Sequence, residues 1–538
     1  MLGHRTATRT ALALALAMSA VAFAPAGAGA QSANASPELT ANEIAASGPL
    51  PGDVRLYQKE MDCVRDLAPT GYYPSLNGAE LTDAQRSGIF VCAPFSGSFD
   101  GPNRVFAWRS EDGYPATSFI ATRLPGELYI TGGDAPPLKS PIPAGPYIAK
   151  ADATTGRQIW RTYLDNGNAS GNWIATTNLN ILPNGNIITA WSSNVALIDG
   201  DTGLILKQNT LPSGPTAQEN VNFKHLTIAP DGTVILKDQT RPEDCPLQGT
   251  LAVLKCVPEG KKQGNSILVA VDPDTLEVLD SLPLPEPSTV PHIITEFEGK
   301  IAIYVGVNSG ALRYFWDPAA RKLSQDPSWV VSPMQKGQTT SDAPSLLGDW
   351  IVLQTNGIGS RTTASSIVAV RQSDAKDVHV IFPFGPLKPG EMSFAPAKPQ
   401  TDPENSMIYS ADMGVGKVAG IKIDQATGEM ETAFVLEDRT NTFQPLFGPK
   451  DTRVLLLSNI KLDNPSDSFM KAIFSQSYTE QVTWRDAATG RILAESDFFE
   501  PLTINSLIPP GFGGRFYFPT SSGFIVFQVL PKAADSGN

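Results

Sequence analysis

One short motif recurs along this 538-residue sequence and limits what the chain can fold into. In its clearest form an alternating apolar run leads into Asp-x-x-Thr-Gly, and a second alternating run follows. The first example is residues 149–164, AKADATTGRQIWRTYL. Alternation indicates strands, and Asp, Thr and Gly favour a tight turn between them. Each copy therefore predicts a β-hairpin.

Further copies follow at a regular period. They are residues 195–212, 268–285, 418–438 and 482–499, with degenerate copies at 312–331 and 366–386. Asp152 and Asp199 are 47 residues apart, and two short strand patterns lie between the hairpins, so that one unit has four strands. Four-stranded units at this period bury their faces by packing around an axis. The sequence therefore predicts an all-β protein, a β-propeller.

The two ends of the repeat region predict how the ring closes. Seven hairpins lie between residues 147 and 499, and residues 502–531 supply three more strands without a fourth. The missing strand is assigned to residues 103–110, NRVFAWRS. Pairing this N-terminal strand into the last blade would leave no open sheet edge in the ring. We expect eight four-stranded antiparallel blades, with seven as the alternative if a degenerate copy is not a blade.

The N-terminal region has the pattern of an export signal. Arg5 and Arg9 precede an apolar run, and Ala28 and Ala30 occupy the positions that a signal peptidase reads. No later segment approaches the roughly 20 apolar residues of a transmembrane helix. We expect a secreted or periplasmic monomer, divided into a signal peptide (1–30), a flexible leader (31–52), an N-terminal extension (53–102), the propeller (103–531) and a C-terminal tail (532–538).

Charge and cysteine content limit the partners and the compartment. The formal net charge of −13 argues against nucleic acid as a partner. Four cysteines in an exported chain favour disulfides over free thiols. Cys245 and Cys256 end a segment that can fold back on itself through its Pro and Gly, so they are paired with each other. Cys63 is therefore paired with Cys92, within the N-terminal extension.

The first hairpin also resembles a known repeat. Ala149, Asp152, Gly156 and Trp160 match the tryptophan-docking repeat of quinoprotein alcohol dehydrogenase-like β-propellers, in which the Trp packs between blades. Dehydrogenases of that superfamily hold pyrroloquinoline quinone and calcium at the mouth of the central channel, usually over a disulfide between adjacent cysteines. This sequence has no Cys-Cys pair, and the calcium ligands and base of the superfamily find no counterparts residue by residue. The resemblance therefore leaves pyrroloquinoline quinone and calcium open.

The starts of the innermost strands converge on one funnel in any propeller, which makes them the default place for function. The polar or aromatic residues at these starts are Ser118, Trp173, Lys224, His225, His292, Asp342, Ser393, Gln444 and Asn505. His225, His292 and Asp342 can form an acid–base group or a metal site, and Lys224 can stabilise an anion or oxyanion. Alternatively, these side chains bind only water and one another.

These residues suggest several functions. The first is an exported propeller that binds a small molecule or a partner protein at its funnel face, without a conventional redox cofactor. The second is a periplasmic dehydrogenase of alcohols or sugars that uses pyrroloquinoline quinone and calcium, with Asp342 as base. The third is a hydrolase or lyase that uses His225, His292 and Lys224. The sequence alone leaves open whether the protein is an enzyme and which metal, if any, it binds.

Overall fold

The computed structural model describes residues 57–133, 145–164, 178–247, 252–332, 338–359, 362–440, 444–464, 468–501 and 507–532. The predicted signal peptide and leader lie outside these ranges. The secondary structure of the described residues is almost entirely β; the helical segments are α2 (Gln58–Leu67), α3 (Phe469–Ser475), η2 (Gln218–Asn220), η3 (Ala252–Cys256) and η4 (Lys450–Thr452). None of the described helices is long and apolar enough to cross a membrane.

The strands form eight antiparallel sheets, numbered here as blades in chain order. Blade 1 contains β3 (Phe119–Thr122), β4 (Glu127–Gly132), β5 (Tyr147–Asp152) and β6 (Gln158–Tyr163). Blade 2 contains β7 (Asn178–Ile181), β8 (Ile187–Trp191), β9 (Asn194–Ile198) and β10 (Ile205–Thr210). Blade 3 contains β11 (Val221–Ile228), β12 (Val234–Thr240), β13 (Ile267–Val271) and β14 (Val278–Pro283). Blade 4 contains β15 (His292–Phe297), β16 (Lys300–Val307), β17 (Gly310–Asp317) and β18 (Lys322–Val331).

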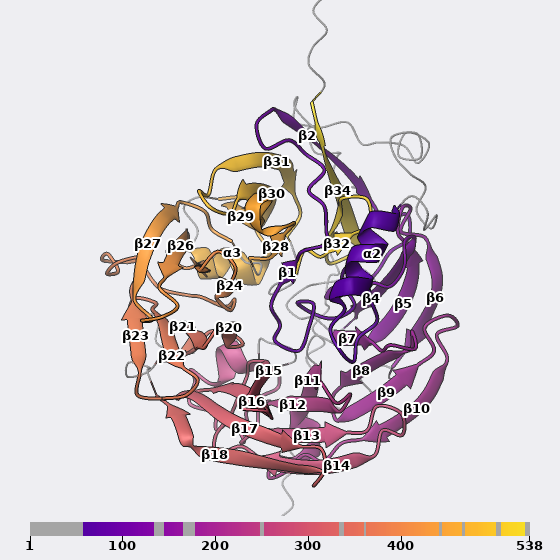
Figure 1. Cartoon of the computed structure of the whole chain (residues 1–538), viewed down its shortest axis with the longest axis vertical. Helices are drawn as coiled ribbons and strands as arrows, with labels where there is room; N and C mark the ends of the chain where they lie inside the picture. The colour runs from indigo at the N-terminus through magenta and orange to yellow at the C-terminus, as the bar shows by residue number, and fades with distance from the viewer. Residues whose placement is uncertain are drawn as a thin grey trace, which may run out of the picture. The chain divides into compact units, whose positions relative to one another are not determined.

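The remaining blades follow the same order around the ring (Figure 1). Blade 5 contains β19 (Gln338–Thr340), β20 (Ser345–Leu347), β21 (Trp350–Gly359), β22 (Ile367–Arg371) and β23 (Val378–Ile381). Blade 6 contains β24 (Gln400–Asp402), β25 (Met407–Asp412), β26 (Lys417–Ile423) and β27 (Met430–Leu436). Blade 7 contains β28 (Leu446–Phe447), β29 (Val454–Leu462), β30 (Tyr478–Asp486) and β31 (Ile492–Phe499). Blade 8 contains β32 (Pro510–Gly511), β33 (Arg515–Pro519), β34 (Phe524–Pro531) and β2 (Asn103–Arg109).

The ring closes through both ends of the repeat region. β2 pairs antiparallel with β34, so that Asn103 lies opposite Pro531 and Arg109 opposite Ile525. The prediction of an eight-bladed propeller closed by an N-terminal strand is therefore confirmed, and the seven-bladed alternative is excluded.

The repeated Asp residues build the hairpin turns. The Asp152 carboxylate accepts hydrogen bonds from the backbone N–H groups of Thr154 and Thr155, at 3.0 and 2.8 Å, and from the Thr155 hydroxyl at 2.9 Å. Gly156 completes the turn at φ +69°, a conformation that costs glycine little. The same bonds recur at Asp199 and Asp272. These carboxylates are therefore structural.

Tryptophan side chains tie several blades to the next. The indole N–H of Trp108 donates to the Thr154 carbonyl, across the boundary between blades 8 and 1, at 2.8 Å. Trp329 of blade 4 and Trp350 of blade 5 donate in the same way to carbonyls of the following blade, at 3.0 and 2.9 Å. Each indole thus buries its apolar ring between two sheets and satisfies its polar atom on the second.

One segment of the N-terminal extension crosses the axis of the ring (Figure 1). Residues 69–93, here called the closing segment, bond to innermost strands in at least six blades, through Thr122, Ile181, Ile228, Ile294, Gln400 and Leu446. Three of these partners, Thr122, Ile181 and Ile228, are the last residues of their strands. In blades 1 to 3 the closing segment therefore lies where the innermost strands end, whereas Gln400 and Leu446 are the first residues of the short strands β24 and β28.

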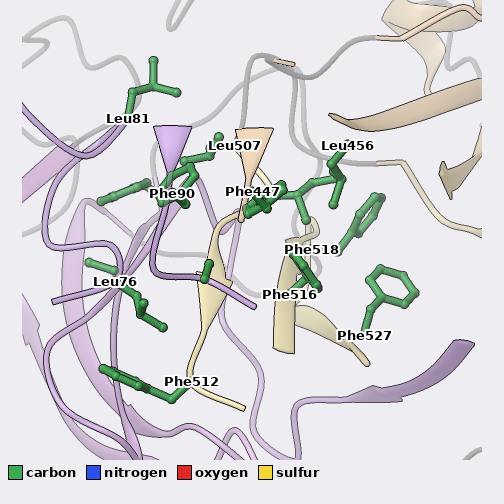
Figure 2. Close-up of a cluster of buried hydrophobic side chains, with 14 of the residues drawn as sticks. Leu76, Leu81, Phe90, Phe447, Leu456, Leu507, Phe512, Phe516, Phe518 and Phe527 are labelled. Atoms are coloured by element: carbon green, nitrogen blue, oxygen red, sulfur yellow. The ribbon is translucent and has the colours of Figure 1, made fainter. Parts of the chain in front are cut away.

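The closing segment also belongs to the hydrophobic core (Figure 2). Leu76, Leu81 and Phe90 lie in one buried cluster with side chains of blades 7 and 8, including Phe447 and Phe516. Its strand β1 (Ile89–Phe90) pairs in parallel with β28, and the rings of Phe90 and Phe447 stack with centroids 5.4 Å apart. Burial of this apolar surface holds the segment against the ring.

Candidate functional site

Two predicted histidines face each other between blades 3 and 4. Ile235 of β12 and Ile294 of β15 pack in the core between these blades. His292 precedes Ile294 by two residues and Lys237 follows Ile235 by two, so both lie on the same strand faces as those isoleucines. His225 pairs with Lys237 across the sheet and therefore shares its face. His225, Lys237 and His292 thus converge on one boundary between blades.

Both imidazoles are enclosed by protein. His225 is 1% exposed and His292 is 0% exposed. Burial, followed by the positive charge of Lys237, lowers the pKa of each imidazole well below its usual value. The backbone of Ile235 favours protonation of His292, but burial outweighs it. Nδ1 of His225 and both ring nitrogens of His292 make no well-formed hydrogen bond to a described residue.

The other two predicted catalytic residues are partly exposed. Lys224 precedes His225 on β11, and Asp342 lies in the break between β19 and β20 of blade 5. Burial raises the pKa of Asp342, whereas the Ala343 N–H and the cations Arg86, Lys224 and Lys398 lower it. The structure therefore brings the four residues predicted as catalytic into one electrostatic group.

Three cations that were not expected there complete this group. Arg86 comes from the closing segment and forms an ion pair with Glu80. Lys237 donates to the Ser288 carbonyl at 2.8 Å, and Lys398 donates to the Ser345 hydroxyl at 2.9 Å. Burial lowers the pKa of Lys398 to about 7. The seven residues Arg86, Lys224, His225, Lys237, His292, Asp342 and Lys398 are called the axial cluster below.

The three cations that the sequence analysis did not predict differ in whether the sequence carries a signal of their burial. Lys237 continues the apolar run of β12, and a lysine in such a run is a signal of a buried charge. Lys398 lies between Pro396 and Pro399 just before β24, outside any alternating pattern. Arg86 belongs to a segment without hydrophobic periodicity. Neither Lys398 nor Arg86 therefore has a local sequence signal of its position.

The predicted ligand-binding residues have mixed positions. Ser393 is buried in the loop before β24, and its hydroxyl donates to the Asp412 carboxylate within blade 6. Gln444 is buried immediately before β28. Trp173 and Asn505 lie outside the described residues. The innermost strands of blades 6 to 8 have only two or three residues, since prolines such as Pro399 and Pro445 interrupt them.

Both predicted disulfides are formed. Cys63 of α2 is joined to Cys92, at the end of the closing segment, and Cys245 is joined to Cys256 in the loop between β12 and β13. Neither pair consists of adjacent cysteines. The two disulfides are therefore loop closures, as expected from a sequence without adjacent cysteines.

The described axial residues do not fit a calcium-held quinone. Calcium takes six to eight oxygen ligands, usually with several carboxylates among them. Within the described ranges, His, Cys, Asp and Glu form no group of three or more that could hold a metal ion. Asp342, the carboxylate predicted for the site, has the three cations Arg86, Lys224 and Lys398 around it, which would oppose a calcium ion.

Comparison with known proteins identifies structures of similar fold, whereas the sequence comparisons find no match. The sequence matches no protein family profile and no curated protein. A quinohemoprotein alcohol dehydrogenase from Comamonas testosteroni has a similar structure, with a TM-score of 0.51 and 10% identity over 90% of this chain and 85% of that one.

Two further solved structures are more distant. A europium-containing methanol dehydrogenase has a TM-score of 0.42 and 9% identity, over 87% of this chain and 99% of its own. BamB from Moraxella catarrhalis has a TM-score of 0.41 and 10% identity, over 74% of this chain and 95% of its own. The eight blades and the likeness to the Comamonas enzyme together show that this chain is an eight-bladed β-propeller, similar in fold to a quinohemoprotein alcohol dehydrogenase.

Proposed function

We propose that this protein is an exported binding protein that holds a small, uncharged, hydroxyl-bearing molecule, a sugar or polyol, in the axial cluster. The observation that carries the proposal is that both His225 and His292 have a buried ring nitrogen without a well-formed hydrogen bond to a described residue, with only the Ile235 backbone close to the His292 ring. Leaving such an atom unpaired costs roughly 1–3 kcal/mol, so native proteins pair it with water or a ligand.

The hydrogen-bonding character of the imidazoles favours a hydroxyl. A lowered pKa keeps both rings neutral at neutral pH, and a neutral imidazole offers one donor and one acceptor. A hydroxyl group can match both, because it donates one hydrogen bond and accepts others. Alcohol groups on a small molecule therefore complement these two side chains.

The charges of the axial cluster favour an uncharged ligand. Each cation has an acidic group close by: Glu80 for Arg86, Asp238 for Lys237, Asp83 and Asp342 for Lys398, and Asp342 for Lys224. These pairs leave no uncompensated charge inside the axial cluster that would favour an added anion or cation there. A polyhydroxylated molecule avoids the desolvation cost of a buried ion.

The ligand would enter from the end of the axis where the innermost strands begin. In blades 1 to 3 the closing segment lies at the other end. Lys224 and Asp342 are the partly exposed members of the axial cluster, so a ligand meets them before it reaches the imidazoles. The lowered pKa values disfavour His225 and His292 as general acids, because a general acid must carry a proton, and they leave the role of general base open.

The export part of the proposal rests on two observations. The chain carries two disulfides, which persist in oxidising compartments. Residues 1–30 have the charged start, apolar run and small-residue end of a cleaved signal. N-terminal sequencing of the protein purified from its cell envelope or medium tests this part, with Gln31 expected as the first residue.

Calorimetric titration of residues 31–538 with glycerol, inositol, hexoses and disaccharides tests the binding. We expect saturable binding of at least one compound, weakened at least 10-fold by His292→Leu and at least 5-fold by Lys224→Ala. His379→Leu, at a partly exposed histidine of β23, is the control and should bind as the wild type does. Failure of the whole panel to bind, or equal binding by the His292 variant, would overturn the proposal. Calcium-dependent binding of pyrroloquinoline quinone with dye reduction would replace it with the dehydrogenase alternative.

A further inference from the structure

A separate cavity of about 360 Å³ lies against the closing segment. The closing segment and the end of α2 form most of its wall, and blades 5 and 6 contribute Leu346 and Pro403. This volume lies within the range of pockets that enclose a small organic molecule. No residue of the axial cluster lines this cavity, here called the closing-segment pocket.

The wall of the closing-segment pocket is mostly apolar. Val64, Leu67, Leu76, Ile89 and Val91 line it. Leu67 is 57% exposed and Val91 is 36% exposed, although large apolar side chains in the rest of this wall are largely buried. An apolar ligand would remove these side chains from water, which is a favourable change.

A disulfide holds this wall in place. Every lining residue from Val64 to Val91 lies inside the loop that Cys63 and Cys92 close. The same stretch is anchored to the ring through the bonds of the closing segment and the parallel pairing of β1 with β28. Binding therefore needs little ordering of the wall, which favours affinity.

The charged groups that line the pocket are acidic. They are Asp83 and Glu404; no lysine or arginine is among its described lining residues. The Asp83 carboxylate accepts hydrogen bonds from the Ser87 N–H at 3.0 Å and the Ser87 hydroxyl at 2.6 Å, which fixes its position. Each of these acids also has a cationic neighbour that does not line the pocket. Lys398 faces Asp83, and Arg453 forms an ion pair with Glu404.

We propose that the closing-segment pocket binds a small apolar molecule that carries a primary amine. The apolar body would lie against Leu67, Leu76 and Val91, and the ammonium group would bond to Asp83. Complementary charge argues for an amine over a carboxylate, since the lining supplies only acidic groups. This site shares no lining residue with the axial cluster, and Asp83 faces Lys398 of that cluster from the pocket side.

Titration of residues 31–538 at pH 7.5 with phenethylamine, 2-phenylethanol and phenylacetate tests this proposal, because the three probes share a ring and differ in the polar group. We expect the amine to bind at least 10-fold more tightly than the alcohol, and phenylacetate to bind most weakly. Equal affinity for all three probes, or no binding of the amine, would overturn the proposal.

Two variants place the site. Leu67→Lys should weaken amine binding at least 5-fold, because it removes an apolar contact and adds a like charge. Leu204→Lys is the matched control, since Leu204 is 65% exposed at a blade turn outside the pocket. Asp83→Asn should abolish the preference for the amine over the alcohol. Unchanged amine binding by Leu67→Lys would overturn the proposal even if the Asp83 variant fails to fold.

Discussion

The indole of Trp160 lies against the backbone of Gly203, across the boundary between blades 1 and 2. A Cβ atom at Gly203 would lie 2.6 Å from Cδ2 of Trp160, and the residue has φ +74°. The tryptophan of blade 1 therefore requires a glycine in the facing turn of blade 2, because only glycine leaves room for the indole ring.

Gly203→Ala should lower the free energy of unfolding by about 2–4 kcal/mol, since it adds a steric clash to backbone strain. Gly232→Ala is the control, because Gly232 has φ +90° and a Cβ added there would have no atom within 4 Å. That variant should lose only the strain contribution, about 1 kcal/mol. Urea unfolding of both proteins measures the difference, and equal losses would contradict the docking argument.

Removal of the two disulfides should have unequal effects. Cys63 and Cys92 are 29 residues apart, whereas Cys245 and Cys256 are 11 apart. On the chain-entropy account, the longer loop stabilises by about 3.6 kcal/mol and the shorter by about 2.8 kcal/mol. We expect Cys63→Ser with Cys92→Ser to lower the melting temperature more than Cys245→Ser with Cys256→Ser. Only the first pair should also affect the closing-segment pocket.

Lys398 should make stability rise with pH above neutrality. Its pKa is about 7 in the folded protein, against an ordinary value of 10.5, so the unfolded chain binds more protons between these two values. The free energy of unfolding should therefore gain up to about 1.4 kcal/mol per pH unit in this window. Urea titrations from pH 7 to pH 10 should show a shallower slope for Lys398→Met. Parallel slopes would show that burial does not hold this lysine neutral.

The buried histidines should make the protein sensitive to acid. Their pKa values lie well below the ordinary 6.5, so stability is fully present above that pH and falls as the pH drops below it. His292→Gln should reduce this fall between pH 6.5 and pH 5 by up to about 1.4 kcal/mol per pH unit. His379→Gln, at a residue that is 30% exposed, serves as the control. A His292 variant that loses stability as steeply as the wild type would contradict the lowered pKa.

The fold was predictable because its signal is local and repeated. Asp152 and Gly156 define a turn by their own hydrogen bonds and backbone angles, and each further copy repeats the same chemistry. Closure of the ring could be predicted by counting strands. The last blade had three strands in the sequence, and residues 103–110 formed a strand that belonged to no other blade. The pairing of Cys245 with Cys256 followed from the short segment between them.

The rest of the structure has no comparable local signal. The closing segment is held by backbone hydrogen bonds to innermost strands and by buried side chains such as Leu81 and Phe90. These apolar residues have no regular spacing, so no periodic pattern in residues 69–93 indicates where they lie. The positions of His225 and His292 could be inferred from the repeat because both lie on innermost strands. Arg86 joins them only through the closing segment, and so its place in the axial cluster required the structure.

The pairing of β2 with β34 also determines when the ring can close during synthesis and folding of the chain. Residues 103–109 find their partner only when residues 525–531 exist beside them, nearly the whole sequence later. A chain that emerges N-terminus first, from a ribosome or through a membrane, must hold an unpaired strand until its last blade appears. A closed ring therefore requires synthesis at least as far as residue 531. A chain that stops within the last blade would leave β2 unpaired, and strands of other molecules could pair with that open edge.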